Sequence, residues 1–334
     1  MWAPPRRQVY SIGQNRAVQL DERSVGGRVS VRREVDDPGG RFTDVVGHLL
    51  DLTEASLTVL RASGEVVDLN RSAVTAAKVV PPARVRPGWA VPDVSPDDMQ
   101  RTCWAGWPAR EVETLGDWAL RAHGGLTGRA NSAMAVGDPG LPTREALDAV
   151  ERWYVAKALP PLLQLPLADP RNLEMADAGW ARLHVTIVQV APVAPLLATV
   201  PDRTMRAVVE PTPSADWLSL MHDLEDDVGS HVAILTGPPV VGFATLYRGD
   251  EPVGIGRVSV EGEWCGVTSV DVAPAARRRG VGTEVMAVLL SWAADQGAVA
   301  SYLQVRAANA GALRLYAALG YVTHHPYNYR APSA

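Results

Sequence analysis

The sequence predicts an α/β protein in which a small β-barrel precedes two successive helix–strand units. Three observations lead to this fold class. Residues 26–80 alternate apolar and polar side chains, as half-buried strands do. Residues from 99 onward mix helical and extended patterns, and one order of helix and strand occurs twice. A chain of 334 residues that is 47% hydrophobic and 21% charged can bury more than one core.

The barrel is predicted from short alternating runs that are separated by turns. Val29 and Val31 alternate with polar neighbours, as do Leu57 and Val59, and turn signals such as Ser63-Gly64 lie between the runs. About four or five short strands of this kind are enough for a small barrel. Five prolines follow between residues 81 and 96, which favours an extended linker.

The remainder of the chain resembles a tandem duplication. Thr143–Lys157 and Val281–Ala294 read as amphipathic helices, and each is followed by an apolar run, a shorter helix closed by glycine, and a strand. Leu163-Gln164-Leu165 resembles Leu303-Gln304-Val305, 140 residues later. Chance similarity between two amphipathic units is the alternative. The parts we expect are a flexible tail (1–24), the barrel (25–84), the linker (85–98), a degenerate first lobe (99–200) and a complete second lobe (201–334).

The sharpest chemical signal is a glycine loop between a strand and a helix. A strand ending near Val272 leads through Pro274 into Arg277-Arg278-Arg279-Gly280-Val281-Gly282, and a helix follows. The first N–H groups of a helix lack internal partners and its dipole is positive there, so such an end binds phosphate. Alone, a loop of this kind is weak evidence for a phosphate site, because glycines often serve only to let the chain turn. Neither the dinucleotide-binding nor the P-loop glycine pattern is present.

A second block strengthens the signal. Asn309 begins the last predicted helix, Tyr316 follows two helical turns later, and Leu319-Gly320-Tyr321 closes the helix. With both blocks in this order, residues 205–330 resemble the GNAT superfamily of N-acetyltransferases. The whole chain is similar to actinobacterial members that carry a small Src-homology-three-like barrel in front, some of which are labelled histone acetyltransferase.

The resemblance implies acetyl-CoA as cosubstrate and no metal. Its pantetheine is expected between two splayed strands, along the backbone of Gly266–Ala273, and its pyrophosphate on the amides of Arg279–Thr283. The implied cofactor-binding residues are Val270, Val272, Arg277, Arg278, Arg279, Gly280, Val281, Gly282, Thr283, Asn309 and Tyr316.

The same resemblance implies direct attack of a neutral primary amine on the thioester. Tyr316 would protonate the departing thiolate, and a buried helix aromatic is the alternative for this residue. Many relatives use a strand glutamate as base, whereas Gly266-Val267-Thr268 offers no carboxylate. We therefore expect Glu263 or an ordered water to accept the proton, and Asp271 to face away.

The sequence does not identify the acceptor substrate. The acidic run at residues 223–227 forms either a cleft wall that favours a cationic amine or a solvated end of a helix that starts near Ser214. In the first lobe no glycine loop with arginines is present, and Met175 occupies the position of Tyr316, so this lobe should not bind cofactor. The segment 123–131 with Arg129 either borders the acceptor site or is a plain hairpin loop. The alternative functions are a non-catalytic acyl-CoA sensor and a protein-lysine acetyltransferase whose barrel docks a protein partner.

Composition excludes several other classes. A net charge of −5 argues against a nucleic-acid scaffold, and no run of 18 apolar residues suggests a membrane span. The first 20 residues lack the apolar stretch of a signal peptide. Two cysteines form neither a disulfide framework nor a metal cluster, so a cytoplasmic protein is the simplest expectation.

Overall fold

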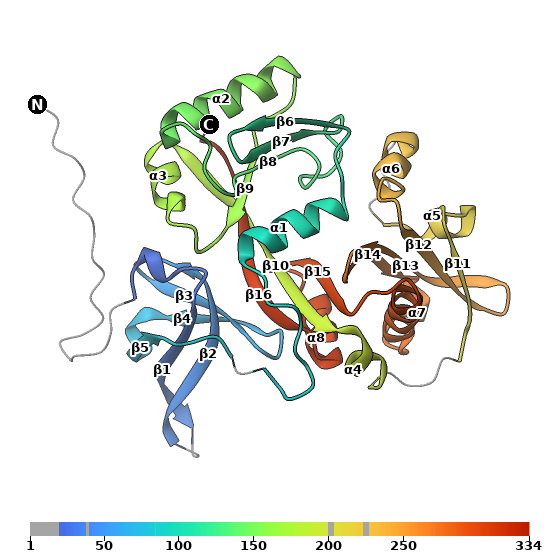
Figure 1. The fold of residues 1–334 in the computed structure, drawn as a ribbon. Helices are drawn as coiled ribbons and strands as arrows, with labels where there is room; N and C mark the ends of the chain where they lie inside the picture. The colour runs from blue at the N-terminus through green and yellow to red at the C-terminus, as the bar shows by residue number, and fades with distance from the viewer. Residues whose placement is uncertain (1–19, 38–39, 84, 200–203, 223–226, 334) are drawn as a thin grey trace, which may run out of the picture.

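The computed structural model describes residues 20–37, 40–83, 85–199, 204–222 and 227–333. The first part is a five-stranded antiparallel sheet in the order β4-β3-β2-β1-β5, which forms the small β-barrel (Figure 1). Its strands are β1 (Arg28–Asp37), β2 (Gly40–Leu52), β3 (Ser56–Arg61), β4 (Val66–Asn70) and β5 (Val74–Val79), with a 3-10 turn at Arg71–Ala73 before the last.

The barrel core follows the alternation in the sequence. Val29, Val31, Leu57 and Val59 are all fully buried, as their period of two predicts. Residues 1–19 of the expected tail lie outside the described residues. Leu20, however, is fully buried with these side chains and Glu22–Ser24 forms a 3-10 turn, so ordered structure begins before residue 25.

An eleven-stranded mixed sheet forms the rest of the molecule, in the order β11-β12-β13-β14-β15-β10-β16-β9-β8-β7-β6. The strands of the first lobe are β6 (Glu111–Leu115), β7 (Trp118–Ala122), β8 (Ala133–Met134), β9 (Leu163–Pro166) and β10 (Trp180–Pro192). Those of the second lobe are β11 (Arg206–Glu210), β12 (Val241–Arg248), β13 (Glu251–Glu261), β14 (Trp264–Val272), β15 (Ala300–Arg306) and β16 (Val322–Pro332).

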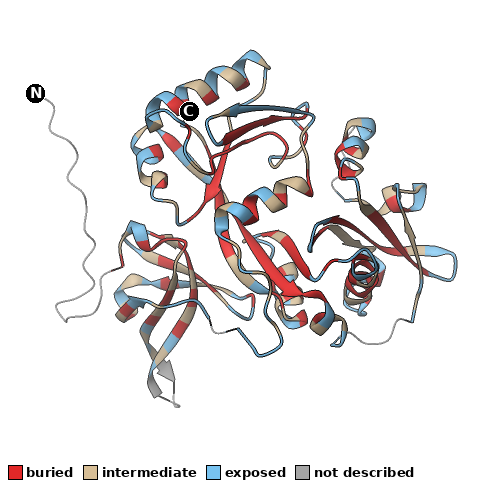
Figure 2. Cartoon of the chain, viewed as in Figure 1, coloured by how far each residue is buried: buried red, intermediate tan, exposed pale blue. Residues whose placement is uncertain are grey.

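The strand order shows that the two lobes exchange their last strands. β10 closes the first lobe in sequence but lies between β15 and β16 of the second, with Ile187 paired to Val305 and to Pro326. β16 in turn lies between β10 and β9, with Tyr329 paired to Gln164. The sheet therefore continues unbroken through both lobes, and Figure 2 shows its central strands largely buried.

The duplication is visible in the pairing as well as in the order. β8 runs parallel to β9, as β14 runs parallel to β15, and the other strand pairs are antiparallel. The repeated tripeptides both fall on the second strand of these parallel pairs, at Leu163 in β9 and Leu303 in β15. The fold class predicted from the sequence, a barrel followed by two related α/β lobes, is confirmed.

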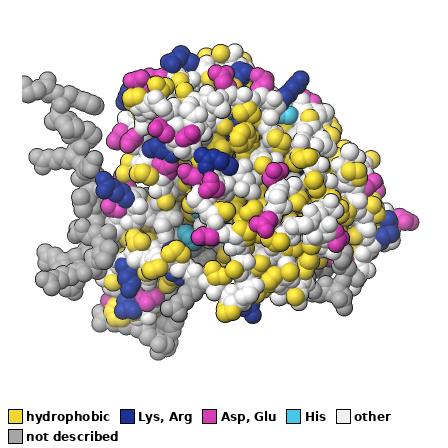
Figure 3. All heavy atoms as spheres, in the orientation of Figure 1, with side chains coloured by type: hydrophobic (Ala, Val, Ile, Leu, Met, Phe, Trp, Pro, Cys, Tyr) yellow, Lys and Arg dark blue, Asp and Glu magenta, His cyan; other side chains and the backbone are white. Residues whose placement is uncertain are grey.

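The helices lie on both faces of the sheet. They are α1 (Pro96–Ala105), α2 (Thr143–Ala156), α3 (Arg171–Asp177), α4 (Val193–Leu197), α5 (Ala215–Leu220), α6 (Val228–Leu235), α7 (Val281–Asp295) and α8 (Ala310–Leu319), with a further 3-10 turn at Pro274–Ala276. Within the described ranges, no helix is long and apolar enough to cross a membrane. On the face drawn in Figure 3, acidic, basic and apolar side chains lie interspersed.

Several helices begin where the sequence provides a side-chain cap. Ser95 accepts a hydrogen bond from the Asp98 N–H at 3.0 Å and caps the start of α1, which lies near the centre of the molecule in Figure 1. Ser214 caps α5 in the same way. The expectation that one helix runs from Ser214 to the acidic run is wrong, because α5 ends at Leu220 and Asp227 caps the next helix, α6. Residues 223–226 of that run lie outside the described residues.

The strand exchange makes a direct prediction about truncation. A chain reduced to residues 201–334 lacks β10, so β15 and β16 lose the partner strand between them and expose its hydrogen-bonding edges. We expect this fragment to be insoluble or unfolded by circular dichroism, whereas residues 98–334 fold. A cooperative thermal transition in the 201–334 fragment would contradict the exchange.

Candidate functional site

The candidate site begins where β14 and β15 separate. The two strands pair in parallel from Trp264 opposite Ala300 to Val267 opposite Leu303, and the pairing stops there. β14 nevertheless continues to Val272 and β15 to Arg306. The backbone of β14 beyond Val267 is therefore not paired to a strand on this side, which is the geometry that an extended ligand can use by adding main-chain hydrogen bonds.

A bulge marks the same point of β14. Its register with β13 shifts between Ile255, opposite Asp271, and Arg257, opposite Thr268. Ser269 takes a positive φ of 51°, which is uncommon for a residue with a side chain. Val270 and Val272 pack against the core beneath α7, and Asp271 instead accepts a hydrogen bond from the His222 N–H at 3.4 Å.

The N-terminus of α7 lies just after this strand. Gly280 is its N-cap with φ +82°, and a Cβ built on it meets no atom within 4 Å, so its outer side is open. The first helical hydrogen bond runs from the Glu284 N–H to the Gly280 carbonyl, which leaves the three N–H groups of residues 281–283 without an acceptor in the helix. Arg277, Arg278 and Arg279 are exposed around it, and Arg277 Nε donates to the Val272 carbonyl at 3.1 Å.

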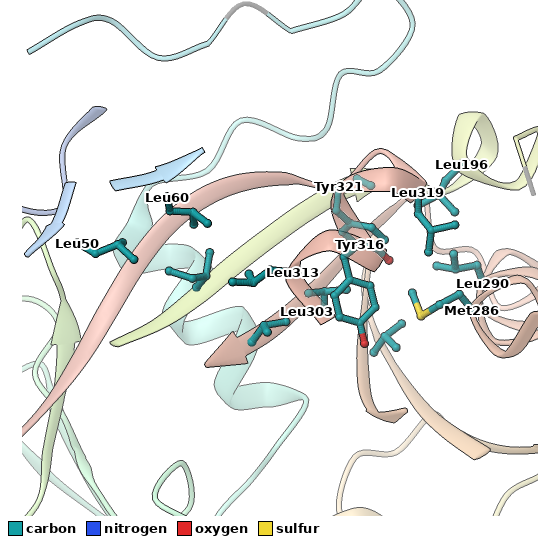
Figure 4. Packing of buried hydrophobic residues seen from close by; sticks show 14 of the residues in the cluster. Leu50, Leu60, Leu196, Met286, Leu290, Leu303, Leu313, Tyr316, Leu319 and Tyr321 are labelled. Carbon is teal, nitrogen blue, oxygen red and sulfur yellow. The ribbon is translucent and has the colours of Figure 1, made fainter. Parts of the chain in front are cut away.

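Asn309 and Tyr316 come from α8. The Asn309 side chain caps the helix by accepting from the Ala312 N–H at 3.0 Å, and it is exposed. Tyr316 is 8% exposed and stacks edge-to-face on Tyr321, with ring centroids 5.8 Å apart (Figure 4). Burial, and secondarily the negative charge of Asp271, raise the pKa of Tyr316 above its usual range. The phenol therefore stays protonated at neutral and mildly alkaline pH.

Glu263 is not brought to this site. It is exposed in the turn before β14, where its carbonyl accepts hydrogen bonds from the N–H groups of Val299 and Ala300 at 2.9 and 3.0 Å. Thr268 lies five residues further on, about 16 Å away at 3.3 Å per strand residue. The structure places Glu263 at the paired end of β14 and the separation of the strands at the other end.

The opposite face of the sheet carries groups that the sequence analysis missed. Arg257 on β13 is fully buried, and its guanidinium donates to the Leu235 carbonyl (2.7 Å), the Gly106 carbonyl (3.1 Å) and the Thr268 hydroxyl (3.1 Å). Trp107, also buried, lies 5.3 Å from this guanidinium. The signal for Arg257 was available, because it is a lone charge inside the apolar run from Val253 to Val260.

The corresponding place in the first lobe is closed. Arg171 donates to the carbonyls of Ala135 (3.1 Å) and Gly137 (2.6 Å), the backbone that follows β8. In the following turn, the N–H groups of Asp138 and Gly140 are bonded to the carboxylates of Asp117 and Asp138. Amides that are already bonded to carboxylates are not free for phosphate, and the two negative charges repel it.

This arrangement predicts one acetyl-CoA per chain. In the described residues, the second lobe combines separated strands, an open glycine at the helix start and a tyrosine on the following helix, while Met175 of the first lobe is fully buried among apolar side chains. Isothermal titration of the full chain should give a stoichiometry near one. A stoichiometry of two would refute the closed first lobe.

Comparisons with known proteins agree with this geometry. Residues 98–330 match the family described as Probable histone acetyltransferase Rv0428c C-terminal, and residues 23–78 match the Rv0428c N-terminal Sm-like domain. The chain is 26% identical over 317 residues to the Probable histone acetyltransferase Rv0428c of Mycobacterium tuberculosis (strain ATCC 25618 / H37Rv), covering 91% of this chain and 94% of that protein. It is 28% identical over 240 residues to the Uncharacterized N-acetyltransferase YobR of Bacillus subtilis (strain 168), covering 70% of this chain and 96% of that protein.

A solved structure shares the fold. The GCN5-related N-acetyltransferase from Kribbella flavida superposes with a TM-score of 0.57 at 18% identity, covering 71% of this chain and 95% of that chain. The family match covers more than half of the sequence and includes both lobes. The chain therefore belongs to the family of the Rv0428c C-terminal region, and it is an acetyltransferase of the GCN5-related type with an Sm-like barrel in front.

Proposed function

We propose that the protein transfers the acetyl group of acetyl-CoA to a primary amine by direct attack. The observation that carries the proposal is the junction of three features in the second lobe. β14 separates from β15 after Val267, the α7 N-terminus begins eight residues after the end of β14, and Tyr316 is buried on the neighbouring helix. Each feature suits one part of acetyl-CoA.

The phosphates suit the loop around Gly280. Three unpaired N–H groups point out of the first turn of α7, and the helix dipole adds positive potential there. Gly280 leaves its outer side open to the pyrophosphate, and the exposed guanidinium groups of Arg277, Arg278 and Arg279 supply further charge. The pantetheine arm would continue along Val270 and Val272, where β14 has no partner strand on one side.

The thioester would then lie near the point of separation, between the two faces of the sheet. Tyr316 approaches from the α8 side and can give its proton to the departing thiolate. The acceptor amine enters from the opposite face, where Thr268 and Trp107 lie. The attack needs no covalent bond to the protein, because a neutral amine is itself the nucleophile. The proton that the nitrogen loses on acetylation would pass to an ordered water. A backbone N–H of β14 beyond Val267 would bind the oxyanion.

Release of CoA tests the proposal. The full chain, acetyl-CoA and a panel of primary amines are combined, and free thiol is measured against a control without amine. Amine-dependent thiol release with a matching acetylated product supports an enzyme. Tight acetyl-CoA binding with no amine-dependent release across the panel would favour the non-catalytic sensor.

A further inference from the structure

The first lobe contributes an ordered loop to the acceptor face of the second lobe. Within residues 123–131, Asn131 Oδ1 accepts from the N–H groups of His123 (2.7 Å) and Gly125 (2.9 Å), and its Nδ2 donates to the Thr127 carbonyl (3.0 Å). Thr127 is held at φ +56°, a costly conformation for a β-branched residue. Its hydroxyl accepts from Trp107 Nε1 at 3.1 Å. The loop is thus fixed internally and anchored on Trp107.

This loop presents Arg129 over the ring of Trp107. The guanidinium carbon lies 4.3 Å from the ring centroid, and Arg257 lies 5.3 Å from the same ring. Burial, against an opposing effect of Tyr302, and then the nearby positive charge of Arg129 together lower the pKa of Arg257 to about 9. Among the residues that the structure describes, no carboxylate pairs with either guanidinium. Two cations are therefore gathered around one aromatic ring, and none of the described residues supplies a counter-charge.

A third arginine completes the cluster. Arg121 is 2% exposed and donates to the Ser132 carbonyl (2.9 Å), the Ser132 hydroxyl (2.8 Å) and Gln164 Oε1 (3.0 Å), all of which are uncharged. Arg129 also lowers the pKa of Arg121, after the larger effect of burial. A small pocket with room for about one water molecule opens beside Arg121 and Arg129. Its lining residues are Cys103, Trp104, Trp107, Arg121, Arg129, Gln164 and Gln304.

The pocket borders the point where the strands separate. Gln304 follows Leu303, the last residue of β15 that pairs with β14. Tyr302 packs with Met99 and Cys103 of α1 in one buried cluster, so the alternate residue Gln304 faces the same side of the sheet. Tyr316 packs with Leu303 in the cluster beneath α7, on the other side. An acceptor in the pocket and the general acid would therefore approach the thioester from opposite faces.

Positive charge that no described carboxylate balances suits an anion, because desolvated cations are costly unless they are paired. We propose that Arg129, where this pocket opens, binds an anionic group of the acceptor, a carboxylate or a phosphate, and so selects the acceptor. The proposal rests on the acetyl transfer proposed above. Arg129 suits this role because it is partly exposed and stacked on Trp107, and it makes no hydrogen bond or ion pair with the described residues. Its planar guanidinium can therefore bind an oxyanion through two hydrogen bonds.

Matched amines test the proposal on the full chain. β-Alanine is compared with 3-aminopropanamide, and O-phosphoethanolamine with ethanolamine, so that each pair differs in charge. We expect the anionic member of at least one pair to have the higher kcat/KM, and the pair that responds tells carboxylate from phosphate. Arg129→Gln should lower that kcat/KM by about 10- to 100-fold, the range for a hydrogen-bonded charge, and leave the neutral amines within about twofold.

Two variants serve as controls. Arg152→Gln removes one positive charge from an exposed position of α2 and should change neither charge preference nor rate. Arg129→Lys keeps the charge without the planar fork and should restore part of the preference. Thermal unfolding of each variant shows whether the fold is intact. A merely structural role of Arg129 would lower kcat/KM for all four amines alike, and that result would overturn the proposal.

A measurement of amine binding distinguishes failure of this proposal from failure of the acetyl transfer on which it rests. The four amines are titrated calorimetrically into the protein saturated with CoA. Anion-selective binding that Arg129→Gln removes, without thiol release, would support the pocket and refute acetyl transfer to these amines. Thiol release from neutral and anionic amines at equal kcat/KM would support acetyl transfer and refute the pocket. Absence of both anion-selective binding and anion-selective turnover would likewise overturn it.

Discussion

Replacing Gly280 with aspartate is expected to abolish acetyl-CoA binding while leaving the fold largely intact. The new carboxylate would lie at the α7 N-terminus, where we place the pyrophosphate. Two unit charges about 4 Å apart near a protein surface repel each other by about 4 kcal/mol. We therefore expect the affinity to fall by at least about 100-fold, measured by isothermal titration with acetyl-CoA.

The fold should tolerate the change because a Cβ at Gly280 meets no atom within 4 Å and aspartate is among the residues that accept a positive φ. Gly280→Asn is the matched variant, since it imposes the same backbone cost without the charge. Gly297→Asp is a second control, because Gly297 has φ +94° and open space at the far end of the same helix. Wild-type affinity in Gly280→Asp, with its melting temperature preserved, would refute the assignment of the loop.

The glycine loop between β14 and α7 could be predicted from the sequence because its determinants are local, while its role in cofactor binding stays a prediction. A strand, a glycine with positive φ and the start of a helix lie within about a dozen residues, and each leaves a mark in the chain. The prediction of α8 with Asn309 at its start and Gly320 after its end is confirmed for the same reason. Both signals depend on spacing within a single element.

The exchange of strands between the lobes could not be predicted from such local patterns. The repeat at Leu163 and Leu303 correctly indicated two related units, yet it does not specify which lobe receives β10. An apolar strand such as β10 would find similar partner strands in either lobe. Its place is therefore decided only when the whole sheet assembles. Division of the chain near residue 200 would separate β10 from the strands that it pairs with.

The set of residues on the proposed acceptor face could not be predicted from local sequence either. Glu263 was predicted as a base because it directly precedes β14, but the paired residues 264–267 lie between it and the point where the strands separate. Arg129 is about 130 residues from Arg257 in sequence, and the two meet only because the first lobe packs against the second. Their shared contact, Trp107, lies in a third segment.

The last expected result concerns Tyr316, on which the proposed chemistry depends. If its hydroxyl protonates the departing thiolate, it acts mainly in the transition state, so Tyr316→Phe should lower kcat far more than it weakens acetyl-CoA binding. General acid catalysis contributes about 10²- to 10⁴-fold, and the loss should fall in that range. A thiolate is already a fair leaving group, which places our expectation nearer the lower end.

Phenylalanine keeps the ring that packs on Tyr321 and beside Leu313, so the loss of packing is confined to the hydroxyl. Tyr321→Phe is the matched control: it removes a hydroxyl from the neighbouring ring, one that is bonded to Ser301 at 2.7 Å, and it should reduce stability without a comparable loss of kcat. If Tyr316 is only a buried helix aromatic, the two variants should behave alike, with small changes in melting temperature and turnover nearly intact. Wild-type kcat in a folded Tyr316→Phe protein would show that another group, or water, protonates the thiolate.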